Sequence, residues 1–234
     1  MITDTLIWPA RLHHIHLTSQ NTPDMVAWYQ NSMGLTPEKL DDGVTWMSGK
    51  GRNLLIGPGP KSGLKFSAFA VENDDQLNRL LARAKETGTP TEASPSPLFG
   101  KSAFALRDPD GNCVVLGTPD RQSAEGAGPA SRLPGRLQHV VVASTDAPRM
   151  IAFYTDVLGF RKSDVVREES GDITACFMRC DPEHHAIAVF RAAENRLDHH
   201  CYETSGWNDI RDWGYHFSER HDIVVWGAGR HGAG

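Results

Sequence analysis

Residues 136–160 read RLQHVVVASTDAPRMIAFYTDVLGF, and residues 11–35 read RLHHIHLTSQNTPDMVAWYQNSMGL. At a constant offset of 125 positions, the two segments share arginine, leucine, histidine, proline, methionine, tyrosine and glycine landmarks without a gap. Chance rarely aligns two segments in this way, so the chain consists of two copies of one design. We place the copies at 1–120 and 136–234, joined at 121–135 by a linker rich in Gly, Ser, Ala and Pro.

Each copy is predicted to begin with a strand, continue with a helix and end in several strands. The valine-rich segment Leu137–Ser144 is typical of a buried strand. Thr145 or Asp146 can cap the following helix, which ends at Gly159 in a left-handed turn. Further expected elements are strands Ala175–Arg179, Ala186–Arg191 and His199–Glu203, a helix Trp207–Arg220 and a strand Ile223–Trp226. The predicted fold class is therefore α+β, with a strand–helix–strands unit used twice in each domain.

Composition narrows the class of protein. The 234 residues are 39% hydrophobic and 23% charged, as in an ordinary globular protein. A net charge of -5 gives no reason to expect nucleic acid or an anionic membrane surface as a partner. No apolar run approaches the roughly 20 residues of a membrane helix, and the N-terminus does not resemble a secretory signal. The four cysteines lack CxxC spacing, so we expect buried thiols in a cytoplasmic protein.

Three motifs carry a resemblance to a known superfamily. FYTDVLGF at 153–160, its echo WYQNSMGL at 28–35, and RDPDGNCVVL at 107–116 resemble segments of vicinal-oxygen-chelate proteins, the glyoxalase/bleomycin resistance superfamily. Their order and spacing make the resemblance specific at superfamily level, and within the superfamily the chain looks like type I extradiol ring-cleavage dioxygenases of the catechol 2,3-dioxygenase kind. The resemblance implies four βαβββ modules in two domains, with metal in the second domain only and with the last module incomplete in this sequence.

The resemblance also assigns roles to histidines of the second copy. His139, which opens the first strand, matches the first metal ligand. The second ligand matches His199 or its neighbour His200, and the distance of eight residues to Trp207 favours His199. His185, in HHAIAVF, matches an active-site histidine of the family, and is expected to be catalytic.

Two histidines and a carboxylate on one face of Fe(II) leave open positions for other ligands, and Mn(II) is an alternative metal. A catechol can occupy two of these positions through its vicinal oxygens, and O2 can occupy a third. His185 would take up a substrate proton and return it. His231, in GRHG, is a second expected catalytic residue and would bind a substrate oxygen. Tyr202 and Trp207 are the expected substrate-binding aromatics, with packing in the core as their alternative role; Phe177, Val189 and Trp226 complete the expected pocket.

The first copy departs from this pattern. His14 keeps the first ligand position, but Phe66 and Val115 stand at the other two, so we expect no metal there. Pairing Phe66 with His199 gives an offset of 133, which carries Val115 to position 248, 14 residues beyond Gly234. The third ligand, a glutamate, is therefore expected outside the printed sequence. Glu203 does not replace it in this scheme, and the chain as printed is expected to have little ring-cleaving activity.

The leading functional hypothesis is an extradiol dioxygenase of aromatic catabolism, acting on a catechol-type substrate and O2. The alternatives are a glyoxalase-like metal-dependent isomerase and a metal-free module that binds small molecules. Loss of ligands in the first copy argues against the isomerase, which builds its site from paired modules. The resemblance further implies a homo-oligomer. The sequence leaves open which catechol is cleaved.

Overall fold

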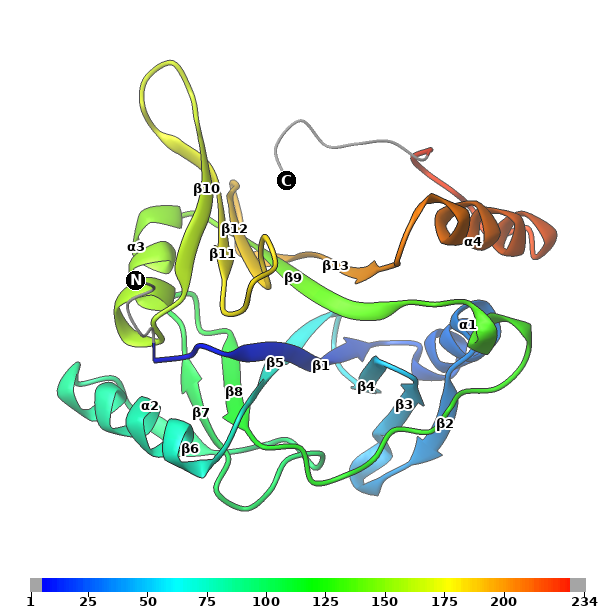
Figure 1. Cartoon of the computed structure of the whole chain (residues 1–234), viewed down its shortest axis with the longest axis horizontal. Helices are drawn as coiled ribbons and strands as arrows, with labels where there is room; N and C mark the ends of the chain where they lie inside the picture. Colours follow the sequence, from blue (N-terminus) through cyan, green and yellow to red (C-terminus); the bar gives the residue numbers. More distant parts are fainter. Residues whose placement is uncertain (1–5, 228–234) are drawn as a thin grey trace.

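The computed structural model describes residues 6–227, in two halves that each hold one sheet (Figure 1). The first sheet has eight strands in the order β2-β3-β4-β1-β5-β8-β7-β6. Short helices η1 (Asp41–Gly43) and η2 (Pro129–Arg132) lie in connecting segments. The other elements of the first half are β1 (Ala10–Ser19), α1 (Thr22–Met33), β2 (Thr36–Lys39), β3 (Thr45–Gly49), β4 (Arg52–Pro58), β5 (Gly63–Val71), α2 (Asp74–Glu86), β6 (Thr91–Ala93), β7 (Phe104–Arg107) and β8 (Cys113–Gly117).

The second sheet has five strands in the order β10-β11-β12-β9-β13. Its order repeats the β2-β3-β4-β1-β5 part of the first sheet, and β1–β4 and β9–β12 are both parallel pairs. The predicted repeat and the α+β class are thereby confirmed. The elements of the second half are β9 (Arg136–Ser144), α3 (Ala147–Ala152), the π-helical turn η3 (Phe153–Val157), β10 (Arg161–Arg167), β11 (Ile173–Arg179), β12 (Ile187–Arg191), β13 (Arg196–Glu203) and α4 (Trp207–Glu219).

The expected strand at Ile223–Trp226 is wrong, because within residues 6–227 this segment forms no strand. Its counterpart in the first half is β6, which pairs only with β7. The described part of the second half holds no counterpart of β7, so the segment has no strand to pair with. Val225 is 94% exposed, as expected for an apolar residue that is not part of a paired strand.

Helix boundaries follow from local chemistry. Asp146 caps α3, since its side chain accepts a hydrogen bond from the backbone N–H of Arg149 at 3.2 Å. Gly159 ends the helical segment with φ of +81°, as the sequence predicted. Its counterpart Gly34 has φ of +65°, and a Cβ there would lie 2.4 Å from the backbone nitrogen of Ser131. The close approach of the linker makes a side chain at Gly34 unacceptable.

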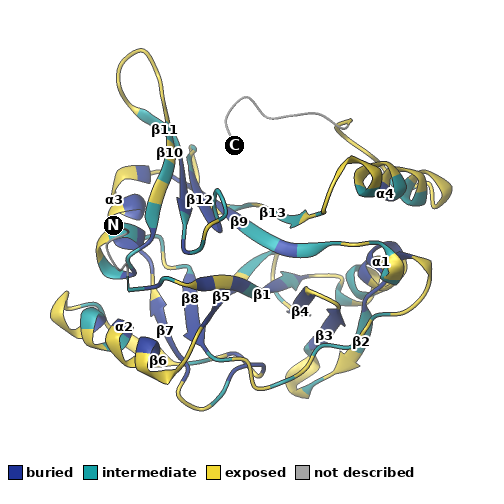
Figure 2. Ribbon diagram, viewed as in Figure 1, coloured by how far each residue is buried: buried dark blue, intermediate teal, exposed yellow. Residues whose placement is uncertain are grey.

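One hydrophobic core serves both halves. Figure 2 shows that buried residues gather where the two sheets and α3 meet, and a single cluster includes Leu12 and Ile15 of β1 together with Val140 and Val142 of β9. All four cysteines are free thiols, and three are buried: Cys113, Cys176 and Cys180, with Cys201 half-buried. Among the described residues, no helix has the length and apolar character needed to cross a membrane.

Candidate metal centre

Three histidines of the second half converge on one face of its sheet. The ring centroid of His139 on β9 lies 4.1 Å from that of His185, which precedes β12, and 5.6 Å from that of His199 on β13. The register explains the convergence, because His199 pairs with Val141 and Cys201 pairs with His139. Paired residues of an antiparallel sheet point to the same face, as do alternate residues of a strand. His139 and His199 therefore share a face.

His200 points to the opposite face. Its Nε2 lies 3.2 Å from the hydroxyl of Tyr29 on α1. Burial, with a smaller contribution from the charge of His199, lowers the pKa of His200 to about 4. Of the two adjacent histidines, the structure thus brings His199 to His139 and places His200 in the packing between the two halves.

The sheet face beneath the three histidines is apolar. Val141, Phe177 and Ala188 form a small buried cluster there, with Phe190 packed against it. The ring of Phe177 lies 5.0 Å from that of His185, and the ring of Phe190 lies 6.1 Å from that of His199. The expectation that Val189 lines this surface is wrong, because the side chain of Val189 belongs to the main core on the other face of β12.

The predicted aromatics Tyr202, Trp207 and Trp226 differ in their surroundings. Tyr202 is half-buried on the His200 side of β13, with its ring 5.6 Å from that of His200. Trp207 begins α4 and is 54% exposed, and Trp226 is 87% exposed. Tyr202 therefore lies on the side of β13 opposite His199, and the substrate-binding roles of Tyr202 and Trp207 stay predictions. His231 lies outside the described residues, so its role stays a prediction.

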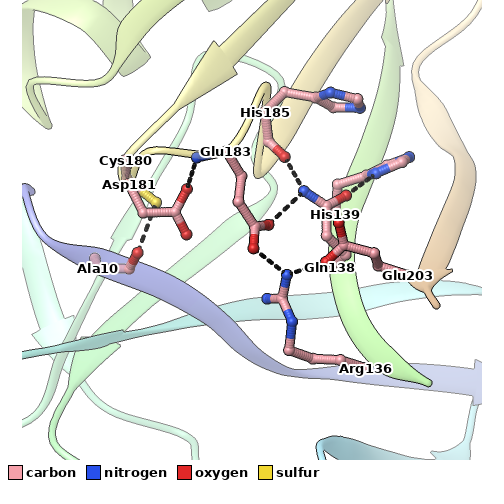
Figure 3. A network of polar contacts seen from close by, with 9 residues as sticks. All are labelled: Ala10, Arg136, Gln138, His139, Cys180, Asp181, Glu183, His185 and Glu203. Atoms are coloured by element: carbon pink, nitrogen blue, oxygen red, sulfur yellow. Dashed lines mark hydrogen bonds and ion pairs between the residues drawn. The ribbon is translucent and has the colours of Figure 1, made fainter. Parts of the chain in front are cut away.

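Polar side chains on the preceding residues orient both predicted ligands, and Figure 3 shows the contact between Gln138 and His139. Asp198 Oδ2 lies 2.8 Å from His199 Nδ1, and Gln138 Oε1 contacts His139 Nδ1. Burial raises the pKa of Asp198, but hydrogen bonds and positive charge from His199 and Arg196 outweigh it, and the net shift is downward. An ionised Asp198 accepts the Nδ1 proton of His199 and leaves the lone pair on Nε2, the usual arrangement behind a metal-bound histidine.

A wider network holds Gln138. Its Nε2 donates to Glu183 Oε2 at 3.0 Å and to the backbone oxygen of His185. Arg136 donates in turn to the carboxylates of Glu183 and Glu203. The sequence reasoning missed Gln138, Asp198 and Glu183. The available signal was the polar residue that directly precedes each predicted ligand.

Two imidazoles with oriented rings fit the histidine part of a non-haem Fe(II) or Mn(II) site. Within residues 6–227, no group of three His, Cys, Asp or Glu side chains lies close enough together to hold a metal ion. Glu203 accepts a hydrogen bond from Arg136 at 2.5 Å, and the expectation that it does not serve as the third ligand stays a prediction. The glutamate predicted at position 248 stays a prediction.

The corresponding place in the first copy is packed. His14 is fully buried, and its Nε2 lies 2.8 Å from Ser96 Oγ. The rings of Phe66 and Phe99 meet the His14 ring edge-on, and Val115 is fully buried. Burial, with smaller contributions from neighbouring His13 and His16, lowers the pKa of His14 well below its usual value. His14 is therefore a neutral histidine of the packed interior.

The fold and the convergent histidines define a protein built from paired vicinal-oxygen-chelate modules. The family model described as the Glyoxalase/Bleomycin resistance protein/Dioxygenase superfamily matches residues 11–116 and 136–234, and the chain belongs to this superfamily.

Several curated relatives are named as dioxygenases. The chain is 27% identical over 193 residues to a 3-methylcatechol 2,3-dioxygenase of Pseudomonas putida, covering 76% of this chain and 66% of the relative. It is 33% identical over 172 residues to a biphenyl-2,3-diol 1,2-dioxygenase of Paraburkholderia xenovorans, covering 67% and 58%. A manganese-dependent 2,3-dihydroxybiphenyl 1,2-dioxygenase of Geobacillus genomosp. 3 is 25% identical, covering 95% and 78%. The chain thus spans less than two thirds of the length of the first two relatives.

Solved structures show the same fold. The 2,3-dioxygenase LapB from Pseudomonas sp. KL28 superposes with a TM-score of 0.82 at 21% identity, covering 95% of this chain and 84% of that one. A Mn(II)-bound glyoxalase from Novosphingobium aromaticivorans superposes with a TM-score of 0.79 at 23% identity, covering 96% and 76%. At these identities the likeness concerns the fold alone.

Proposed function

We propose that the protein is an extradiol dioxygenase, which cleaves the ring of a catechol-type aromatic next to its vicinal hydroxyl groups and incorporates both atoms of O2. The observation that carries the proposal is the convergence of His139, His185 and His199 over an apolar sheet face. The relatives named as dioxygenases of 3-methylcatechol and biphenyl-2,3-diol support the reaction class.

His139 and His199 would hold the metal, together with the glutamate proposed outside the printed sequence. Bound Fe(II), or Mn(II) in its place, would supply positions for the two vicinal oxygens and for O2 and would pass electron density from the diol to O2. The manganese in the names of one relative and one solved structure supports keeping both metals in the proposal.

The remaining chemistry belongs to the protein's own side chains. The His185 imidazole lies against His139 and therefore beside the place that a chelating diol would occupy. It would accept a proton from a catechol hydroxyl and return it as the ring opens. Phe177 and Phe190 offer flat apolar surface to an aromatic ring and exclude water from it. His231 is proposed to bind a substrate oxygen.

The test is catechol turnover after anaerobic loading with Fe(II), followed by O2 uptake and by the yellow colour of a ring-fission product. It is run on the chain as printed and on a chain that includes position 248. His199→Gln should lower Fe(II) affinity and turnover by more than about 100-fold, because it removes a ligand. His200→Gln is the matched control, since this neighbour faces away from the site, and it should stay within about ten-fold.

The proposal is overturned if the longer chain consumes no O2 with any catechol, or if His200→Gln is the damaging variant. The alternative of a glyoxalase-like isomerase predicts turnover of a thiol adduct of an α-ketoaldehyde without O2. The apolar Phe66 and Val115, which occupy the ligand positions of the first copy, count against a site shared between modules.

A further inference from the structure

Gln138 lies at the centre of a hydrogen-bond chain that joins the two histidines of the candidate site. Its amide nitrogen donates to Glu183 Oε2 at 3.0 Å and to the backbone oxygen of His185, and its amide oxygen contacts His139 Nδ1 (Figure 3). One side chain therefore touches the predicted ligand, the backbone of the predicted proton carrier and a carboxylate.

The partners decide which way the amide points. A carboxylate and a backbone carbonyl can only accept hydrogen bonds, so the NH2 end of Gln138 must face Glu183 and His185. The oxygen end then faces His139, and an amide oxygen can only accept. His139 Nδ1 must therefore carry the proton in this contact, which leaves the lone pair on Nε2.

Glu183 is itself fixed. Arg136, two residues before Gln138 on β9, donates to Glu183 and to Glu203 Oε2 of β13. The guanidinium thus ties the loop that carries Glu183 and His185 to both strands that carry the predicted ligands. A rotation of the Gln138 amide by half a turn would set its oxygen against the Glu183 carboxylate, and the network opposes this.

The first copy lacks this arrangement. His13 stands at the position of Gln138, and its Nδ1 lies 2.8 Å from His14 Nδ1. Either ring nitrogen of that pair can be the donor, so the contact does not select a tautomer. Only the second copy, which keeps the predicted ligands, therefore places a pure hydrogen-bond acceptor, the amide oxygen of Gln138, beside the Nδ1 atom of its first histidine.

We propose that Gln138 is a positioning residue, which locks His139 in the Nδ1–H tautomer so that Nε2 is ready to bind a metal ion, and which holds His185 at its working distance. The inference rests on the proposed function for the identity of the metal. The tautomer itself is a property of the protein without metal.

The test uses protein labelled with ¹⁵N-histidine, free of metal, at a pH where His139 is neutral, with the His139 signal assigned by its loss in His139→Gln. Wild-type His139 should show the Nδ1–H tautomer. Gln138→Leu should shift the population toward Nε2–H, which neutral imidazole prefers in water. The same variant should weaken Mn(II) binding by about 10- to 100-fold, the usual effect of losing a group that orients a ligand. Gln30→Leu, the same change at an exposed position of α1, should alter neither readout.

A second variant covers the case in which Gln138→Leu fails to fold. The exchanged pair Gln138→Glu with Glu183→Gln keeps an acceptor toward His139 and a donor between the two positions, while it loses only the hydrogen bond to the backbone oxygen of His185. It should restore the Nδ1–H tautomer and bring Mn(II) affinity within a few-fold of wild type.

Wild-type His139 in the Nε2–H form, or an unchanged tautomer in Gln138→Leu, would overturn the proposal. A locked tautomer in a protein that cleaves no catechol would instead defeat the proposed function and leave this inference standing.

Discussion

His199 and His200 are neighbours in the sequence with opposite surroundings. The spacing to Trp207 favoured His199 as the ligand, and the structure places His199 on the face of His139, while the ligand role itself stays a prediction. The same alternation, carried to Tyr202, assigns that residue to the His200 face. The sequence therefore held the signal that places Tyr202 on the side of β13 opposite His199. Burial of the individual aromatics, by contrast, depends on packing that no local pattern reveals.

At the residue scale, His13 makes stability depend on pH. Burial, with a smaller contribution from the charge of Arg11, lowers its pKa from 6.5 to about 4 in the folded protein. The side chain also faces His14 and the ring of Phe99. Between pH 6.5 and about 4 the unfolded chain binds a proton that the folded protein does not, so stability falls as the pH falls through this window.

We expect His13→Gln to reduce that loss, because Gln138 occupies the same position in the second copy. Lowering the pH from 7.5 to 5 should cost wild type about 2 kcal/mol more than the variant, measured by urea denaturation at both pH values. Equal losses in the two proteins would show that His13 titrates normally in the fold.

At the scale of elements, α4 is a helix that the sequence predicted, but its position against the rest of the protein depends on contacts with other segments. Its bounds, Trp207–Glu219, agree with the expected Trp207–Arg220 within one residue. Its docking depends on Trp213, whose Nε1 donates to the backbone oxygen of Pro134 at 2.8 Å and whose ring stacks on Phe217. The amphipathic pattern indicated a helix, but no pattern of its own residues could indicate that its partner lies in the linker.

Trp213→Phe should lower the free energy of unfolding by about 1–3 kcal/mol, because the Pro134 carbonyl loses its donor in a partly buried place. Trp207→Phe makes the same chemical change at a tryptophan that is 54% exposed and should cost less than about 0.5 kcal/mol. Urea titrations of the two variants measure the difference. Similar costs would mean that α4 is not anchored by the Trp213 contact.

At the scale of the whole molecule, equivalent residues of the two copies make reciprocal contacts between the halves. Tyr29 and Tyr154 occupy equivalent positions of the two copies. The Tyr29 hydroxyl meets His200 of the second half, and the Tyr154 hydroxyl donates to Asp108 Oδ2 of the first half at 3.1 Å. The sequence predicted two copies and their order, because the offset is constant. It could not predict that the matching tyrosines cross the boundary, because such contacts depend on how the copies pack together.

Tyr154→Phe tests this link between the halves. Tyr154 is 1% exposed, and burial is the largest cause that raises the pKa of both its hydroxyl and the Asp108 carboxyl. Loss of the hydrogen bond should lower the free energy of unfolding by about 1–3 kcal/mol. Tyr215→Phe, at a tyrosine that is 65% exposed, should change it by less than about 0.5 kcal/mol. Chemical denaturation measures the free energy of unfolding of both variants. Equal changes in the two variants would show that the hydrogen bond between Tyr154 and Asp108 does not help to hold the halves together.

The core shared by β1 and β9 has a consequence for how such a duplicated protein can diverge. After a gene duplication, a copy that no longer needs its functional residues can often accumulate substitutions. Here the first copy carries Phe66 and Val115 where ligands would stand, yet its other face completes the interior of the copy that keeps the histidines. Selection on the second copy therefore protects the shape of the first. A second copy that folds alone would have to be engineered by redesigning the shared face, since deleting the first copy would leave that face in water.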